Sequence, residues 1–254
     1  MVYAVPRFLP RYLMVMLLAA ALPSQPARGA GLPAVVELAQ PENEALTAAS
    51  FEILKEAYRR LGIAAEQIKL PGERAIQMVN SGQYFGDVMH AEGLELTYPN
   101  LVRVPVPLLD IEAVVFTYGR ELAVADWAGL KPYRVCIRRG IKTVERATVG
   151  MDNVLGVNQY AFIFNMLKLG RCDVAVLPRS AWLEAQRLQF KGLRSQETPL
   201  QTWPSYHYLH KSHAELVPAL AEQLQKMHQS GYLARSAADF TQRLDAASRE
   251  GQVP

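Results

Sequence analysis

Four arginines lie beside predicted strand or helix ends, where a ligand could reach them: Arg74, Arg138, Arg139 and Arg179. A guanidinium can donate two parallel hydrogen bonds to a carboxylate or phosphate. Gly140 and a predicted helix follow the middle two, and the first backbone N–H groups of a helix favour anions. This arrangement predicts an anion-binding cleft. The alternative is that these arginines are solvated or paired with neighbours such as Glu73 and Glu145, and surface pairs contribute only about 0–1 kcal/mol.

Three further polar side chains follow predicted strands and could point into the same cleft: His90, Glu92 and Tyr118. Tyr118 combines an apolar ring with a polar tip, which binding clefts favour. A loop histidine is often simply solvated, but His90 and Glu92 together are a candidate acid–base pair. Successive residues of a strand face opposite ways, so we expect Arg138 rather than Arg139 to face the ligand.

The sequence lacks the compact motifs of several enzyme classes. It contains no nucleophile elbow, P-loop, zinc-binding H-E-x-x-H or complete dinucleotide fingerprint. His207, His210 and His213 stand three apart, but on a strand the first two face opposite sides, so we do not expect them to bind a metal. We therefore expect a non-enzyme without metal or cofactor, and an enzyme built on His90 and Glu92 is the alternative.

Segments with strand-like and helix-like hydrophobic spacing alternate along the chain. The first unit predicts strand, helix, strand, helix and strand over residues 34–39, 46–61, 65–70, 71–82 and 86–89. Two further strands are predicted over 101–106 and 111–118. The second unit predicts a short helical turn over 126–131, then strand, helix, strand, helix and strand over 133–137, 143–149, 154–157, 159–169 and 173–177. This order implies parallel strands with crossover helices, hence an α/β fold.

The C-terminal part is predicted to be mainly helical after a strand over 206–209. Ser212 and Glu215 have the spacing of a capping box, and an apolar stripe follows them. Pro218 would lie inside that helix, so we expect an irregular first turn. A last amphipathic helix is predicted over 234–247.

Residues 1–29 have the layout of a secretory signal peptide. Arg7 and Arg11 precede an apolar run of roughly 11 residues, and small residues follow around Gly29, where we expect cleavage. A membrane span needs about 20 residues, so a membrane anchor is the less favoured reading. With Arg28, three of the 27 basic residues lie here, and the other 24 equal the 24 acidic ones. The mature chain therefore shows no basic excess for nucleic acid.

Cys136 and Cys172 are the two cysteines of the chain. Cys136 lies in the first strand of the second unit, and Cys172 leads into its third strand. These strands are often neighbours in a doubly wound sheet, so we expect the two residues to lie close together. A bridge needs Cα atoms within about 7 Å and converging side chains, so a disulfide and two buried thiols both remain open.

Several short motifs, in this order, resemble those of the family 3 extracellular solute-binding proteins. The matching segments are Leu70–Ala75 (LPGERA) with Gly86-Asp87, Tyr98–Pro105, Ala113–Tyr118, Asp126–Lys131 with Val135 and Gly140, Leu167–Ala175 and the return from Tyr208 to Tyr232. The resemblance covers nearly all of the chain after residue 29.

The resemblance implies a two-lobed type II periplasmic binding protein-like fold, each lobe a mostly parallel sheet flanked by helices. Lobe 1 would comprise residues 30–117 and 205–254, and lobe 2 residues 118–204. A ligand would be clamped between the lobes at the carboxyl ends of strands. The implied function is a monomeric periplasmic protein that delivers a small polar ligand to a membrane transporter of the ABC type. A ligand-sensing subunit for a membrane signalling partner is the alternative.

The chain departs from the amino-acid-binding members of that family at both charged anchors. Asn100 stands where those members have the arginine that holds the ligand carboxylate, and Pro178 and Arg179 stand where they have the aspartate that holds the ammonium group. We therefore do not expect an ordinary α-amino acid, and the remaining basic residues favour an anion. The expected ligand-binding residues are Arg74, His90, Glu92, Tyr118, Arg138, Gly140 and Arg179.

Overall fold

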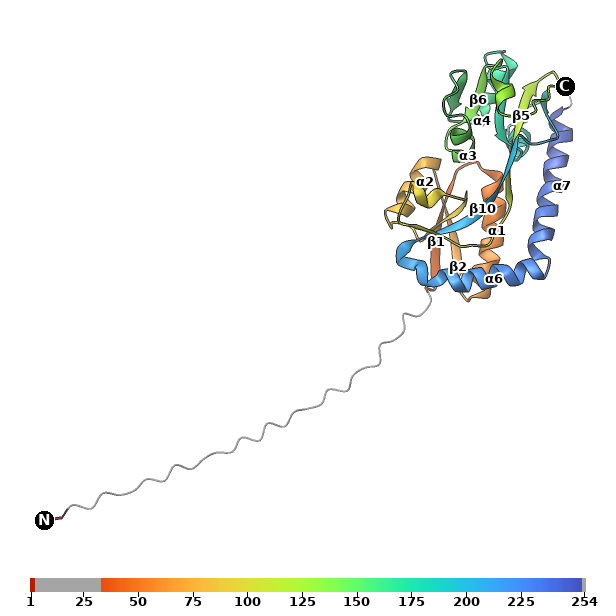
Figure 1. Ribbon diagram of the computed structural model, residues 1–254. Helices are drawn as coiled ribbons and strands as arrows, with labels where there is room; N and C mark the ends of the chain where they lie inside the picture. Colours follow the sequence, from red (N-terminus) through yellow and green to blue (C-terminus); the bar gives the residue numbers. More distant parts are fainter. Residues whose placement is uncertain (3–32, 253–254) are drawn as a thin grey trace. The chain divides into compact units, whose positions relative to one another are not determined.

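The computed structural model describes residues 1–2 and 33–252 of the chain (Figure 1). The expected signal peptide, residues 1–29, falls almost entirely outside the described residues and stays a prediction. Among the residues that are described, no helix is both long and apolar enough to cross a membrane. Residues 33–252 form the mixed α/β fold that the alternating pattern predicts.

Lobe 1 is built on the parallel sheet of the first unit. β1 (Val35–Pro41) lies between β2 (Ala64–Leu70) and β3 (Gly86–Ala91) and runs parallel to both. The crossover helices are α1 (Ala45–Arg60) and α2 (Gly72–Asn80). All five elements agree with the sequence prediction. The helices α1 and α2 bury one apolar face each, whereas β3 is buried on both faces and β2, at the edge of the sheet, has no fully buried residue.

Two long strands connect the two lobes. β10 (Gln201–His210) pairs with β3 and β4 (Leu101–Arg103) after Ser205, and with β5 (Asp110–Tyr118) before it. The rest of β5 pairs with strands of lobe 2. We therefore propose a lobe boundary near Asp110 in place of the one expected at 117–118, and we keep the one at 204–205, where β10 changes partners.

Lobe 2 repeats the parallel pattern. β6 (Val135–Arg138) lies between β7 (Val154–Val157) and β8 (Val174–Pro178), parallel to both, and β5 runs antiparallel to β8. The helical elements that precede and join these strands are η2 (Ala128–Leu130), α3 (Lys142–Ala147) and α4 (Tyr160–Lys168). The second predicted unit is therefore confirmed.

Three short elements have no counterpart in the sequence prediction: η1 (Leu94–Leu96), α5 (Ala181–Arg187) and β9 (Leu193–Ser195). Elements this short do not repeat a hydrophobic period often enough to be recognised. Tertiary packing stabilises α5 instead, because Trp182 is 1% exposed and its ring centroid lies 5.2 Å from that of Phe116.

The C-terminal helices begin differently from the prediction. η3 (Lys211–Leu216) is a 3₁₀ helix, and the His210 side chain accepts from the Ser212 backbone N–H at its start. The expected capping box of Ser212 and Glu215 is therefore wrong. α6 (Val217–Gln229) begins only afterwards, which places Pro218 in its first turn, where a missing N–H is tolerated.

α7 (Tyr232–Gln252) contacts both lobes (Figure 1). Phe240 and Leu244 pack into the core of lobe 1, whereas Ala247 packs into a core of lobe 2. Near its end, the Gly251 carbonyl accepts from the Gly192 backbone N–H at 2.9 Å. α7 is therefore a third connection between the lobes, in addition to β5 and β10.

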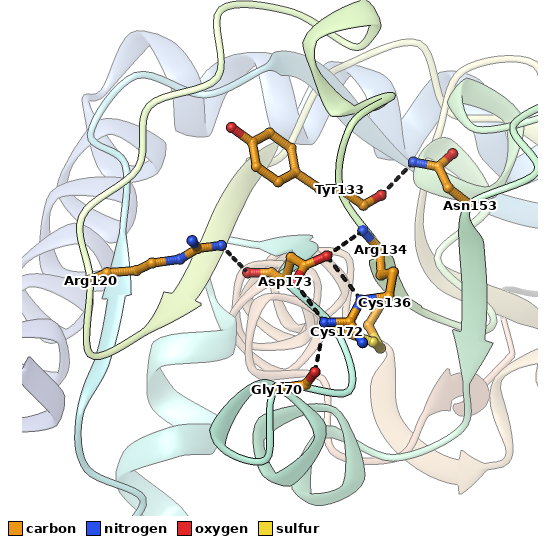
Figure 2. A network of polar contacts seen from close by, with 8 residues as sticks. All are labelled: Arg120, Tyr133, Arg134, Cys136, Asn153, Gly170, Cys172 and Asp173. Atoms are coloured by element: carbon orange, nitrogen blue, oxygen red, sulfur yellow. Dashed lines mark hydrogen bonds and ion pairs between the residues drawn. A yellow bond between two sulfur atoms is a disulfide. The ribbon is translucent and has the colours of Figure 1, made fainter.

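A disulfide joins Cys136 of β6 to Cys172, with the two Cα atoms 5.9 Å apart (Figure 2). The expected proximity is confirmed, and of the two open alternatives the structure has the bridge. Beside it, Arg134 donates to both carboxylate oxygens of Asp173, at 3.0 Å from Nε and 2.7 Å from Nη2. These hydrogen bonds lower the pKa of Asp173 to about 2. Disulfide and ion pair together fasten the amino ends of β6 and β8.

The three C-terminal histidines have separate partners. His207 is fully buried, and its Nδ1 lies 2.8 Å from the Asp87 carbonyl oxygen. Burial lowers the pKa of His207 to about 4. His213 stacks on Phe85, with ring centroids 4.0 Å apart, and His210 hydrogen-bonds Ser212.

Candidate ligand-binding cleft

A cavity of about 160 Å³ lies between the two lobes. Its lining comes from the segments that follow β1 and β3 in lobe 1 and β6 and β8 in lobe 2, with Ile111 of β5 beside them. In open α/β sheets, ligands bind outside the carboxyl ends of the strands. The cavity is therefore the candidate ligand-binding site.

Glu44 of lobe 1, directly before α1, inserts between two side chains of lobe 2. Its Oε2 accepts a hydrogen bond from the Tyr160 hydroxyl at 3.0 Å, and its Oε1 lies 3.3 Å from Arg138 Nε. The Arg138 guanidinium also lies over the Tyr160 ring, 4.9 Å from the centroid. The side chains of Glu44 and Arg138 are only 7% and 14% exposed, so this contact between the lobes is largely dry.

Burial controls the ionisation of Glu44. The pKa of Glu44 is raised from its ordinary 4.5 to about 7, because desolvation outweighs the lowering by Arg138 and by the Tyr160 hydrogen bond. The like charge of Glu184 adds a smaller increase. The protonation of Glu44 therefore changes near neutral pH.

A second ion pair crosses the cleft, from Lys142 of lobe 2 to Glu73 of lobe 1. The Tyr98 hydroxyl donates to Glu73 Oε1 at 2.6 Å, and Lys142 Nζ also lies 3.2 Å from Glu145 Oε2. Burial, with the hydrogen bond to Glu73, raises the pKa of Tyr98 to about 12. Lys142 thus has two carboxylate partners inside the protein.

Two glycines bring the backbones of the lobes together beside these ion pairs. A Cβ placed on Gly140 would lie 4.0 Å from the Gly72 Cα atom. Gly140 has φ +92°, in the left-handed region that favours glycine. Gly140 also lines the cavity, and its role in ligand binding stays a prediction.

His90 lines the cavity at the end of β3. Its Nδ1 lies 2.8 Å and 3.0 Å from the two carboxylate oxygens of Asp87, which is fully buried. A carboxylate only accepts, so Nδ1 is the donor and Nε2 is left at the other side of the ring. Glu92 pairs with Arg103 instead, at 3.2 Å, so the acid–base pair of His90 and Glu92 is not formed.

Three residues of α3 line the cavity although the sequence pattern did not indicate them: Lys142, described above, Thr143 and Arg146. Arg146 reaches across to lobe 1, where its Nη1 would lie 3.5 Å from a Cβ on Gly93. Within residues 33–252 its guanidinium has no ion-pair or hydrogen-bond partner. Thr143 is 4% exposed, and its Oγ1 has no hydrogen-bond partner in the same range. Thr143 and Arg146 are three residues apart and therefore lie on the same face of α3. The only sequence feature that pointed to this face was Gly140, which precedes α3 and was already predicted to lie at the cleft.

The remaining expected site residues lie elsewhere. Arg179 is held at the start of β5, where its guanidinium pairs with the Glu112 carboxylate. Tyr118 is at the far end of β5 and packs against Phe190, with ring centroids 6.0 Å apart. Arg74 is exposed on α2 and, like Glu92, does not line the cavity. Arg138 does not line this cavity either. It lines a separate space of about 660 Å³ and is paired there with Glu44.

Comparison of the chain with known proteins identifies its fold. No family model matches the sequence. An uncharacterized protein of Shewanella oneidensis is 27% identical over 193 residues, which is 72% of each chain. A histidine kinase sensor domain with similarity to periplasmic binding proteins matches with a TM-score of 0.71 at 14% identity, over 81% of this chain and 95% of its own.

Two binding proteins of known structure are similar to the same degree. An ancestral arginine-binding protein bound to arginine has a TM-score of 0.69 at 14% identity, over 82% of this chain and 98% of its own. An amino acid ABC transporter substrate-binding protein of Streptococcus pneumoniae, bound to L-arginine, has a TM-score of 0.67 at 15% identity, over 84% and 96%. The chain has the two-lobed type II periplasmic binding protein fold, as its sequence motifs predicted.

Proposed function

We propose that the protein binds a small polar ligand between its two lobes and delivers it to a membrane transporter. The observation that supports this best is a cavity lined from both lobes at the carboxyl ends of the strands. The ion pairs of Glu44 with Arg138 and of Glu73 with Lys142 supply contacts that form only when the lobes come together. A ligand that also touches both lobes would add to them and shift the equilibrium towards closure.

An α-amino acid is not the ligand that we propose. Asn100, at the position of the usual carboxylate-binding arginine, is tied to Asn80 by two hydrogen bonds of 2.9 Å and 3.1 Å. Arg179, near the position of the usual aspartate, is paired with Glu112 away from the cavity. We therefore do not propose arginine, the ligand bound in the similar structures, as the ligand of this protein.

A thermal-shift screen against small metabolites tests the proposal. A ligand at 100 times its dissociation constant should stabilise the protein by about 2.7 kcal/mol. Thr97→Trp, at an exposed position that lines the cavity, should abolish this stabilisation. Leu96→Trp is the matched control, because Leu96 is 86% exposed and does not line the cavity. Binding that survives Thr97→Trp would place the ligand elsewhere.

A ligand-sensing role is the second candidate, supported by the similarity to a histidine kinase sensor domain. Cross-linking of the ligand-loaded protein to membranes of the source organism separates the two roles. Capture of a transporter permease supports delivery, and capture of a signalling protein supports sensing. Neither delivery nor sensing involves catalysis, and we do not propose that the protein is an enzyme.

We also propose a periplasmic, monomeric protein. The proposed location rests on the signal-peptide layout of residues 1–29. Expression with residues 1–29 should yield a periplasmic product that begins near Ala30, as N-terminal sequencing would show. Recovery of the intact chain in the membrane fraction would favour an anchor. Sedimentation equilibrium tests the monomeric state.

A further inference from the structure

The cavity between the lobes has one cationic side chain that the protein does not neutralise. Of its two lining residues with permanent positive charge, Lys142 is already paired with Glu73 and Glu145. Arg146 is an exposed side chain without such a partner within residues 33–252, and its Nη1 lies at the cavity beside Gly93. One unpaired guanidinium complements one negative charge on a ligand.

Hydrogen-bonding groups for a polar head are present near this charge. Thr143, three residues before Arg146 on α3, is only 4% exposed, and its Oγ1 has no hydrogen-bond partner within the described residues. A buried hydroxyl without a partner costs free energy, which an acceptor on a ligand can recover. From lobe 1, the ring of His90 is oriented by Asp87 and keeps Nε2 for a further contact.

The cavity offers no ionised acceptor for an ammonium group. Glu44 is the carboxylate among its lining residues, and both of its oxygens are engaged, one with Tyr160 and one with Arg138. Asp87 is bound to His90 and fully buried. A zwitterion would therefore find no free carboxylate partner for its positive charge among the lining residues of this cavity.

The rest of the lining is apolar and the space is small. The apolar lining residues include Leu46, Met89, Leu94, Ile111 and Ile141. The cavity of about 160 Å³ is close in size to an engineered cavity of about 150 Å³ that takes up benzene, a molecule of six carbon atoms. A ligand with a body of a few carbon atoms fits this space.

On the basis of the proposed function, we infer that the ligand is a small monocarboxylate with an apolar body. The carboxylate lies between Arg146, Thr143 and His90, and the hydrocarbon part lies against the apolar wall. The arginine that binds the carboxylate is thus contributed by α3 of lobe 2.

Calorimetry with four compounds of similar size tests this inference: butyrate, its neutral isostere butyramide, the zwitterion 2-aminobutyrate and the dianion succinate. We expect butyrate to bind at least tenfold more tightly than each of the others. Arg146→Gln should weaken butyrate at least tenfold and leave butyramide unchanged. Arg74→Gln is the control for loss of an exposed arginine, and it should change neither affinity.

The outcomes separate the ligand class from the function of the cleft. Equal binding of butyrate and butyramide, or butyrate binding that is insensitive to Arg146→Gln, overturns the monocarboxylate. If another compound binds better and Thr97→Trp abolishes its binding, the ligand class is wrong and the proposed function stands. If none of the four binds, the monocarboxylate is also overturned, and the metabolite screen then decides on the cleft. Binding of butyrate that survives Thr97→Trp overturns both.

Discussion

Glu44 and Arg138 come from opposite lobes and meet with Oε1 and Nε 3.3 Å apart, in a position where both side chains are largely shielded from water. The two residues lie 94 positions apart in the sequence, and neither the carboxylate nor its pairing with Arg138 was anticipated from the sequence. In the closing motion that we propose, this contact forms as the lobes come together and so links the ionisation of one carboxyl group to closure.

Ligand affinity should increase as the pH falls from 8 to 6. The pKa of Glu44 is about 7 in the closed form and should fall towards its ordinary 4.5 when the lobes separate and water reaches the carboxyl group. A carboxyl with the higher pKa in the closed form takes up a proton on closure, so closure is favoured below about pH 7 and loses this advantage above it. The limit is about tenfold in affinity per pH unit.

Calorimetry of butyrate, or of the best ligand from the screen, at pH 6, 7 and 8 measures this dependence. Glu44→Gln removes the titrating group and should flatten the part of the profile that is due to Glu44. Arg138, Tyr160 and Glu184 are the groups that face Glu44 and are the same in both. Identical profiles for the two proteins would show that Glu44 is not coupled to closure.

Arg138→Ala should destabilise the fold at pH 8, because it leaves the Glu44 carboxylate buried without its cationic partner. The loss through Glu44 is limited to about 1.4 kcal/mol, since a carboxyl group with a pKa of about 7 can take up a proton at pH 8 for that free energy. The loss should be smaller at pH 6, where Glu44 can take up a proton. The double variant Arg138→Ala, Glu44→Gln should lose less than the sum of the losses of Arg138→Ala and Glu44→Gln. Urea unfolding of the four proteins provides the free energies. A negligible effect of Arg138→Ala at both pH values would mean that Arg138 behaves as an ordinary surface charge.

Gly140→Leu should weaken ligand binding by at least tenfold, because a side chain at this position projects towards Gly72 of lobe 1 and opposes closure. Gly119→Leu is a matched control: Gly119 also has positive φ, at +66°, but a Cβ there would meet nothing within 4 Å. Both variants should lose similar stability from backbone strain, roughly 1–2 kcal/mol. Equal affinity losses in the two proteins would contradict the role of Gly140 in closure.

Replacement of Cys136 and Cys172 by alanine should destabilise the protein by about 3–4 kcal/mol, the loop-closure value for a bridge that spans 36 residues. The affinity for the ligand should change little, since the bridge lies at the amino ends of β6 and β8, away from the cavity. Urea unfolding with and without reductant measures the loss. If unreduced protein reacts with two equivalents of alkylating agent, the bridge is absent.

The sheets of both lobes could be predicted from sequence because parallel strands and crossover helices carry strong hydrophobic periods. The side chains of the site could be predicted less well. The pattern placed Gly140 and His90 at strand ends, and both line the cavity. It could not show that Glu112 on β5 holds Arg179 away from the cavity, because that ion pair depends on the antiparallel register of β5 and β8.

Glu44 and Arg146 were missed for a related reason. Glu44 lies directly before α1 and Arg146 lies in the last turn of α3, and charged residues are commonplace at helix ends. Their positions become informative only when the two lobes are placed face to face, as in the approach of Arg146 to Gly93. Local sequence patterns describe each lobe separately and contain no such information.

The attachment of α7 to both lobes restricts how the protein can open. With β5 and β10 alone, lobe 2 could both swing and twist against lobe 1, since two adjacent strands resist neither motion strongly. α7 adds a tether at a distance from them, anchored at Leu244 in lobe 1 and at Gly251 in lobe 2. A motion that separates the lobes or twists lobe 2 against lobe 1 would therefore have to break contacts of the last turns of α7, so we expect these turns to limit how far the lobes can move apart.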